Sequence, residues 1–166
     1  RRHPHVFGGE RYTTVAEQNA AWERIKTAEK SEQPAGILDG VPLALPGLTR
    51  AIKLQKRASA VGFDWLTIEP VLAKIEEEIA EIRHEIENHA PPERLENELG
   101  DVLFACANLA RHLKLDPEAA LRRTNAKFER RFRQIEQWLA AENRAPTDSS
   151  LAEMDTLWER AKDDEQ

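Results

Sequence analysis

Four acidic side chains near the middle of the chain have the types and spacing to hold a divalent cation. Glu78 and Glu81 are three residues apart in one segment, and Glu98 and Asp101 repeat this spacing in the next. Side chains three apart lie on one face of a helix. Carboxylate oxygens without histidine or cysteine partners favour hard cations, Mg²⁺ or Mn²⁺ before Zn²⁺. We call these four residues the acidic quartet.

The segments that carry the quartet are expected to form an antiparallel helical hairpin. Apolar residues recur every three or four positions over 69–88 and again over 91–113, which predicts a helix in each range. The connection between them is short enough to require antiparallel neighbours. Each quartet residue directly precedes an apolar residue of the repeat, so the quartet should flank the apolar seam.

The quartet residues also match in level along the hairpin. Glu81 and Glu98 are equally far from its middle, and so are Glu78 and Asp101, so each pair should face across it. Four carboxylates in contact repel one another, and we expect the pKa of at least some of them to rise unless a cation joins them. Mg²⁺ usually keeps several waters and also binds phosphate oxygens, so such a patch is typical of an enzyme with a phosphorylated substrate.

Single E-x-x-E patterns are common on solvated helix faces. We assign Glu76, Glu85 and Glu87 to such a face. The matched levels across the hairpin, which a solvated face does not require, favour a metal site for the quartet.

A cationic segment follows the hairpin. Over 111–133, eight arginines and lysines stand against three acidic residues. Lys127 and Arg131 are four apart on one face, where they could compensate the charge of a phosphate chain. The better interpretation of four other arginines is that they offset acidic residues elsewhere in the bundle: Arg122, Arg123, Arg130 and Arg133. Near the C-terminus, a tryptophan and a lysine four apart could stack on a base and contact a phosphate, although a lone tryptophan more often packs. The candidate substrate-binding residues are Asn125, Lys127, Arg131, Trp158 and Lys162.

The rest of the chain predicts an all-α, antiparallel helical bundle. No stretch shows the two-residue alternation of a strand, and only seven glycines occur. Further helices are predicted over 15–30, 46–61 and 116–142, and a last one that is capped by Asp148 and ends near Lys162. We expect residues 1–45 to form an N-terminal helix and linker, and 46–166 to form the main domain. Because the chain starts at Arg1, we expect a fragment or a processed form.

Composition excludes several classes of protein. The 166 residues are enough for one domain with a core, and the net charge of −6 argues against stable nucleic-acid or membrane partners. No apolar run approaches the roughly 20 residues that cross a bilayer, and no secretory signal is visible. The single Cys106 excludes a disulfide framework and a multi-cysteine zinc site. We therefore expect a cytoplasmic protein.

Three ordered motifs resemble those of the MazG nucleoside triphosphate pyrophosphohydrolases. They are E-E-x-x-E at 77–81, E-L-G-D at 98–101 and N-A-K-F-E-R-R-F at 125–132. Supporting stretches at 3–7, 22–26, 45–65 and 108–113 extend the resemblance over nearly the whole chain. The chain resembles the second repeat of the two-repeat form, and residues 3–7 are similar to the tail of a first repeat that is missing here.

The resemblance implies an all-α bundle that forms a homodimer, with its sites near the subunit interface. It implies Mg²⁺-dependent hydrolysis of a nucleoside triphosphate between the α and β phosphates, which gives the monophosphate and pyrophosphate. By position, the acidic quartet would supply the metal ligands, and Lys127 and Arg131 would hold phosphates. Trp158 and Lys162 would complete the nucleotide pocket.

Two other functions are consistent with parts of the sequence. Glu81 and His84 form an E-x-x-H, the motif of ferritin-like di-iron proteins, but that architecture needs a second E-x-x-H on another helix. A helical dimerisation module with no metal in its acidic seam would keep its fold and all of its functions after Glu98→Ala.

Overall fold

The computed structural model describes residues 36–164, and this part of the chain contains helices and turns but no strand. The elements are α3 (Gly47–Ser59), α4 (Glu69–Glu87), α5 (Pro92–His112), α6 (Pro117–Ala141), the 3₁₀ turn η1 (Pro146–Asp148) and α7 (Leu151–Asp163). The predicted all-α fold is confirmed. The helix predicted over 15–30 and the motif at 3–7 lie outside the described residues, and the division between residues 45 and 46 stays a prediction. No helix within 36–164 has the length and apolarity to span a membrane.

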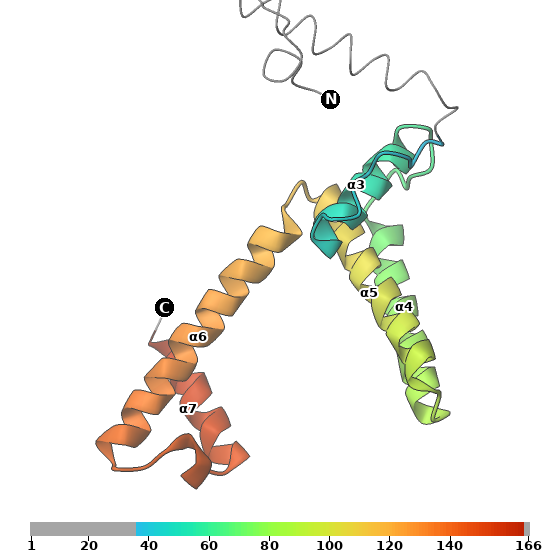
Figure 1. The fold of residues 1–166 in the computed structure, drawn as a ribbon. Helices are drawn as coiled ribbons and strands as arrows, with labels where there is room; N and C mark the ends of the chain where they lie inside the picture. Colours follow the sequence, from blue (N-terminus) through green and yellow to red (C-terminus); the bar gives the residue numbers. More distant parts are fainter. Residues whose placement is uncertain (1–35, 165–166) are drawn as a thin grey trace, which may run out of the picture.

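Helices α4 and α5 lie side by side as a long antiparallel hairpin (Figure 1). The turn between them is tight because His89 adopts a left-handed backbone conformation, with φ at 52°. The amide of Ala90 then donates a hydrogen bond of 3.0 Å to the carbonyl of Glu85, which closes the last turn of α4. Two prolines follow at Pro91 and Pro92, where a missing amide hydrogen is tolerated at the start of α5.

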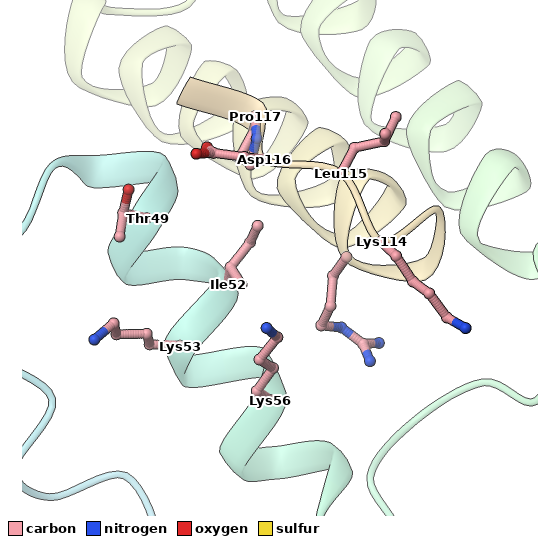
Figure 2. Close-up of a pocket in the computed structure, with 9 residues that line it drawn as sticks. Thr49, Ile52, Lys53, Lys56, Lys114, Leu115, Asp116 and Pro117 are labelled. Carbon is pink, nitrogen blue, oxygen red and sulfur yellow. The ribbon is translucent and has the colours of Figure 1, made fainter. Parts of the chain in front are cut away.

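Helix α3 packs across the C-terminal half of α5 and meets the start of α6. The buried amide of Gln55 in α3 donates a hydrogen bond of 2.9 Å to the carbonyl of Phe104 in α5. Asp116 caps α6 by accepting hydrogen bonds from the amides of Glu118 and Ala119. Figure 2 shows this junction, with Asp116 and Pro117 on the opposite side of a cavity from α3.

From this junction, α6 diverges from the α4–α5 hairpin (Figure 1). Helix α7 packs back against the C-terminal half of α6. Ile135 and Leu139 of α6 are almost fully buried there, as is Ala161 of α7. We call α6, η1 and α7 together the α6–α7 arm.

The cap of the last helix differs from the sequence prediction. Ser150 caps α7 by accepting a hydrogen bond of 3.2 Å from the amide of Glu153. The predicted cap, Asp148, instead accepts a hydrogen bond of 2.8 Å from the amide of Ala145 within η1. The extra 3₁₀ turn shifts the start of the helix by two residues, and Arg144 braces it through two hydrogen bonds to Glu153 of 2.6 and 2.7 Å.

The face that α4 presents to α5 also differs from the prediction. Val71, Glu78 and Glu85 are seven residues apart and are buried, so this stripe faces the hairpin interior. The neighbouring apolar stripe of Leu72, Ile79 and Ile86 is 44–57% exposed. Glu78 therefore lies in the helix contact and not on its flank. Glu85 was predicted to be solvated, which is wrong, because it is buried and forms an ion pair with Arg94 across the turn.

An ionic contact holds the loop after α3 against the end of α5. The guanidinium of Arg111 binds both carboxylate oxygens of Asp64, and the ring of His112 lies 3.1 Å from the same carboxylate. The Arg111 side chain is only 11% exposed. The hydrogen bonds from Arg111 hold the pKa of Asp64 below its usual range.

We expect Asp64→Asn to lower the free energy of unfolding at pH 7 by about 1–3 kcal/mol, because Arg111 loses its carboxylate partner. The folded-state pKa of Asp64 is lowered, so its stabilisation is present above the unfolded pKa and is lost as pH falls through the folded pKa. Urea unfolding should therefore show a difference between variant and wild type at pH 7 that shrinks below about pH 4. The exposed Asp155→Asn on α7 is the matched control. Equal stability of Asp64→Asn and wild type at pH 7 would contradict this role.

Candidate metal centre

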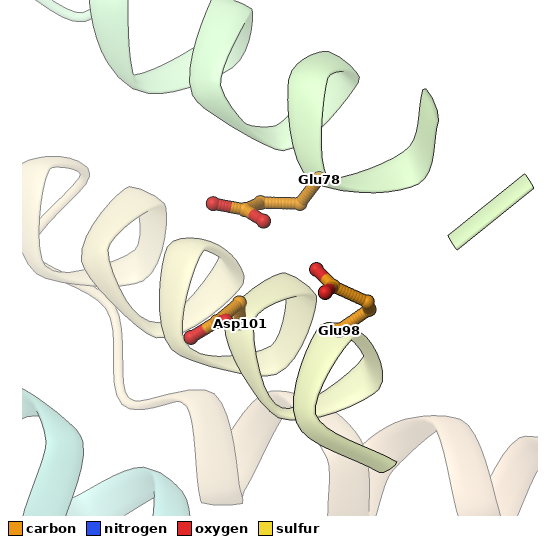
Figure 3. Close-up of side chains that lie close together, drawn as sticks. All are labelled: Glu78, Glu98 and Asp101. Atoms are coloured by element: carbon orange, nitrogen blue, oxygen red, sulfur yellow. The ribbon is translucent and has the colours of Figure 1, made fainter. Parts of the chain in front are cut away.

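Three carboxylates of the quartet come together between α4 and α5. Glu78, Glu98 and Asp101 each offer an oxygen, and these oxygens all lie within 4.8 Å of one another. Figure 3 shows Glu78 reaching from α4 toward the two acidic side chains of α5. We call these three residues the acidic cluster. The predicted proximity of Glu78 to Asp101 is confirmed.

Burial differs strongly within the cluster. Glu78 is 5% exposed, Glu98 is half-buried and Asp101 is exposed. The cluster is therefore anchored inside the hairpin at one end and open to solvent at the other. A cation held there would keep one side free for water or a ligand.

The fourth member of the quartet, Glu81, lies beside the cluster. A hydrogen bond with Glu78 raises the pKa of Glu81, and the negative charges of Glu78 and Glu98 raise it further. Glu81 is thus close enough to both to interact, although it does not belong to the group of three within 4.8 Å. The structure places all four predicted residues in one neighbourhood.

Lys74 compensates part of the cluster's charge, and the sequence analysis missed it. Its ammonium lies 2.7 Å from a carboxylate oxygen of Glu78 and 2.8 Å from one of Glu77. These hydrogen bonds raise the pKa of Lys74, so it stays charged at neutral pH. The sequence signal was the four-residue spacing from Lys74 to Glu78, which places both on one face of α4.

The donor set of the cluster fits a hard divalent cation. All three donors are carboxylates, and one ammonium cannot balance them. Oxygens on opposite sides of a bound Mg²⁺ are about 4 Å apart, so small side-chain movements would bring the cluster to ligand distances. Within the described residues the group includes no histidine. His84 instead lies against the side chain of Asn88, so the ferritin-like alternative has no support here.

The candidate substrate-binding residues lie on the α6–α7 arm. The guanidinium of Arg131 lies 5.6 Å from the ring centroid of Trp158, and Phe128 packs on the same ring at 5.1 Å. Lys162 is hydrogen-bonded to Glu159 at 2.7 Å, and Asn125 and Lys127 are exposed on α6. The structure brings Arg131 and Trp158 together. It does not bring this group to the acidic cluster, because the arm diverges from the hairpin (Figure 1).

Comparison with known proteins gives consistent matches. Residues 66–135, which include the whole acidic quartet, match the MazG nucleotide pyrophosphohydrolase domain. The chain is 45% identical over 164 residues to the nucleoside triphosphate pyrophosphohydrolase of Escherichia coli K12, covering 98% of the chain and 62% of that protein. A Thermotoga maritima relative with the name nucleoside triphosphate pyrophosphohydrolase/pyrophosphatase MazG is 38% identical over 162 residues, covering 98% of the chain and 60% of the relative. The chain thus spans less than two thirds of either relative.

Proposed function

Because the chain belongs to the MazG family, we propose that it hydrolyses nucleoside triphosphates between the α and β phosphates, giving the nucleoside monophosphate and pyrophosphate. The observation that carries this proposal is the convergence of Glu78, Glu98 and Asp101 within 4.8 Å of one another. Two relatives are named for nucleoside triphosphate pyrophosphohydrolase activity, which supports the same reaction.

In this proposal, the acidic quartet binds Mg²⁺, and Mn²⁺ can replace it. The bound cation would acidify an attacking water and neutralise phosphate oxygens. Glu78 anchors the ligand set from inside the hairpin, while Glu98 and Asp101 supply the ligands nearer to solvent. Glu81 completes the set from one turn further along α4. Lys74 offsets part of the charge of Glu78 before the cation arrives.

The nucleotide binds to the α6–α7 arm through its phosphates and base. Lys127 and Arg131 compensate the negative charge that develops on the departing pyrophosphate. Trp158 offers a ring face to the base, while Asn125 and Lys162 provide polar contacts. The packing of Arg131 and Phe128 against Trp158 supports this grouping, because it orients the ring.

The cluster and the arm that binds the nucleotide come from two copies of the chain. Residues 120–130 of α6 are all exposed, including Leu121 and Phe128. Leu99 and Leu103 of α5 and Ile79 of α4 are likewise about half exposed. Large exposed apolar surfaces of this kind are typical of a protein interface. We therefore propose a homodimer in which the arm of one copy lies over the acidic quartet of the other.

Incubation of the chain with ATP or GTP and Mg²⁺ should release pyrophosphate and the nucleoside monophosphate. Asp101→Ala should lower turnover by about 100-fold or more, because it removes a ligand of the cation. The exposed Glu96→Ala on the same helix should leave turnover nearly unchanged. Product analysis by ³¹P NMR or ion-exchange chromatography gives the site of cleavage. Orthophosphate as the first product would contradict the proposed reaction.

Two inactive variants should restore activity when they are co-expressed. In a mixed dimer of Asp101→Ala and the double variant Lys127→Ala/Arg131→Ala, one site combines an intact quartet with an intact arm from the other copy. Random pairing of equal amounts should then recover about a quarter of the wild-type activity. If quartet and arm of one site come from the same chain, every site in the mixed dimer is defective, and activity will not return.

A further inference from the structure

A second charged site lies at the opposite end of α5, in the junction shown in Figure 2. A cavity of about 460 Å³ separates α3 from the end of α5 and the start of α6. This volume is within the range of small-molecule pockets. Polar groups reach it from both walls, with Thr49, Lys53 and Lys56 on α3 and Lys114 and Asp116 on the other side. We call it the lysine cavity.

The lysine cavity gathers positive charge that the described part of the chain does not neutralise. Lys53 and Lys56 are three apart on α3, a helix with no acidic residue. Lys114 lines the cavity from the segment after α5, where a left-handed backbone conformation with φ at 59° turns the chain, and in Figure 2 its side chain and that of Lys53 extend in opposite directions. None of the three ammonium groups has a carboxylate partner within residues 36–164, although the whole chain carries a net charge of −6.

The two other charged residues that line the cavity are already engaged elsewhere. Asp116 accepts hydrogen bonds from the first amides of α6, and in Figure 2 its carboxylate points away from Lys56 and Lys114. The guanidinium of Arg111 is bound by both oxygens of Asp64. The three ammonium groups therefore have no internal counterion, and an anion in the cavity would draw these flexible side chains toward it.

We propose that the lysine cavity binds the phosphate chain of an oligophosphate anion. Lysines are flexible point charges that suit phosphate groups, and three of them around one space favour a ligand with several negative charges over a single carboxylate. The hydroxyl of Thr49 adds a hydrogen-bond donor on the same wall. Ile52, Leu115 and Pro117 add apolar side chains to the lining.

This site is separate from the acidic cluster and does not depend on the proposed reaction. Asp101 and Lys114 are thirteen residues apart, nearly all within α5, which corresponds to about 20 Å along the helix. A phosphate chain in the lysine cavity would therefore be held without a divalent cation, by ammonium groups alone. Removal of metal should abolish turnover and leave this binding intact.

Isothermal titration calorimetry of the metal-free full chain with sodium tripolyphosphate tests the site. Wild type should bind, and Lys53→Ala/Lys56→Ala should weaken the affinity by about tenfold or more, because two charge-assisted contacts are lost. Lys114→Ala, from the other wall, should weaken it as well. The control Arg122→Ala/Arg123→Ala removes the same charge from positions on α6 that do not line the cavity, and it should change the affinity by no more than about twofold, because these charges act on the anion only through screened long-range attraction.

Titration with ATP under the same conditions distinguishes two sources of the phosphate chain. If ATP binds more tightly than tripolyphosphate, and Lys53→Ala/Lys56→Ala loses that binding, the ligand of the cavity is the phosphate chain of a nucleotide. If ATP binds more weakly, the ligand is a free oligophosphate anion. Three results would overturn the proposal: no binding by wild type, unchanged binding by Lys53→Ala/Lys56→Ala, or an equal loss in the control. Loss of tripolyphosphate binding in Lys127→Ala alone would move the anion to the α6–α7 arm and also overturn it. Thermal melting of each variant verifies that the fold is kept.

Discussion

The packing of α4 against α5 depends on compensation of the negative charge of Glu78. This carboxylate is buried in the helix contact, with Glu98 and Asp101 close by, and burial of an unpaired charge is costly. Lys74 neutralises part of that charge from the preceding turn of α4. A divalent cation would neutralise more of it. The same three carboxylates that are costly to bring together in the hairpin are therefore suitable ligands for a cation.

The orientation of α4 connects this charge to the rest of the molecule. Turning Val71, Glu78 and Glu85 toward α5 leaves Ile79 and Ile86 exposed on the adjacent face. The divergence of α6 from the hairpin leaves further apolar side chains uncovered. In the proposed dimer, a second copy that covered these surfaces would also supply the α6–α7 arm, so dimerisation and completion of the site would be one event.

Local sequence rules predicted the helices and the meeting of Glu78 with Asp101, because hairpin length and helical spacing fix those positions. These rules failed where contacts between residues far apart in the sequence determine which side chains are buried and where a helix begins. Helix α4 has two neighbouring stripes that each repeat every seven residues, one beginning at Val71 and the other at Leu72. Hydrophobicity predicted that the wholly apolar stripe from Leu72 faces α5, but the stripe from Val71 does so. The burial of Glu85 depends on Arg94 across the turn, and the true cap Ser150 depends on the 3₁₀ turn before it. In the proposed dimer, the place of the arm relative to the quartet would depend on a second chain, which no local pattern encodes.

Anomalous diffraction from crystals grown with Mn²⁺ tests the central claim most directly. The account predicts an anomalous peak within ligand distance of carboxylate oxygens of Glu78, Glu98 and Asp101, with waters in the remaining positions. Mn²⁺ bound only at other sites, with the Lys74 ammonium still against Glu78 and no peak between the two helices, would contradict it.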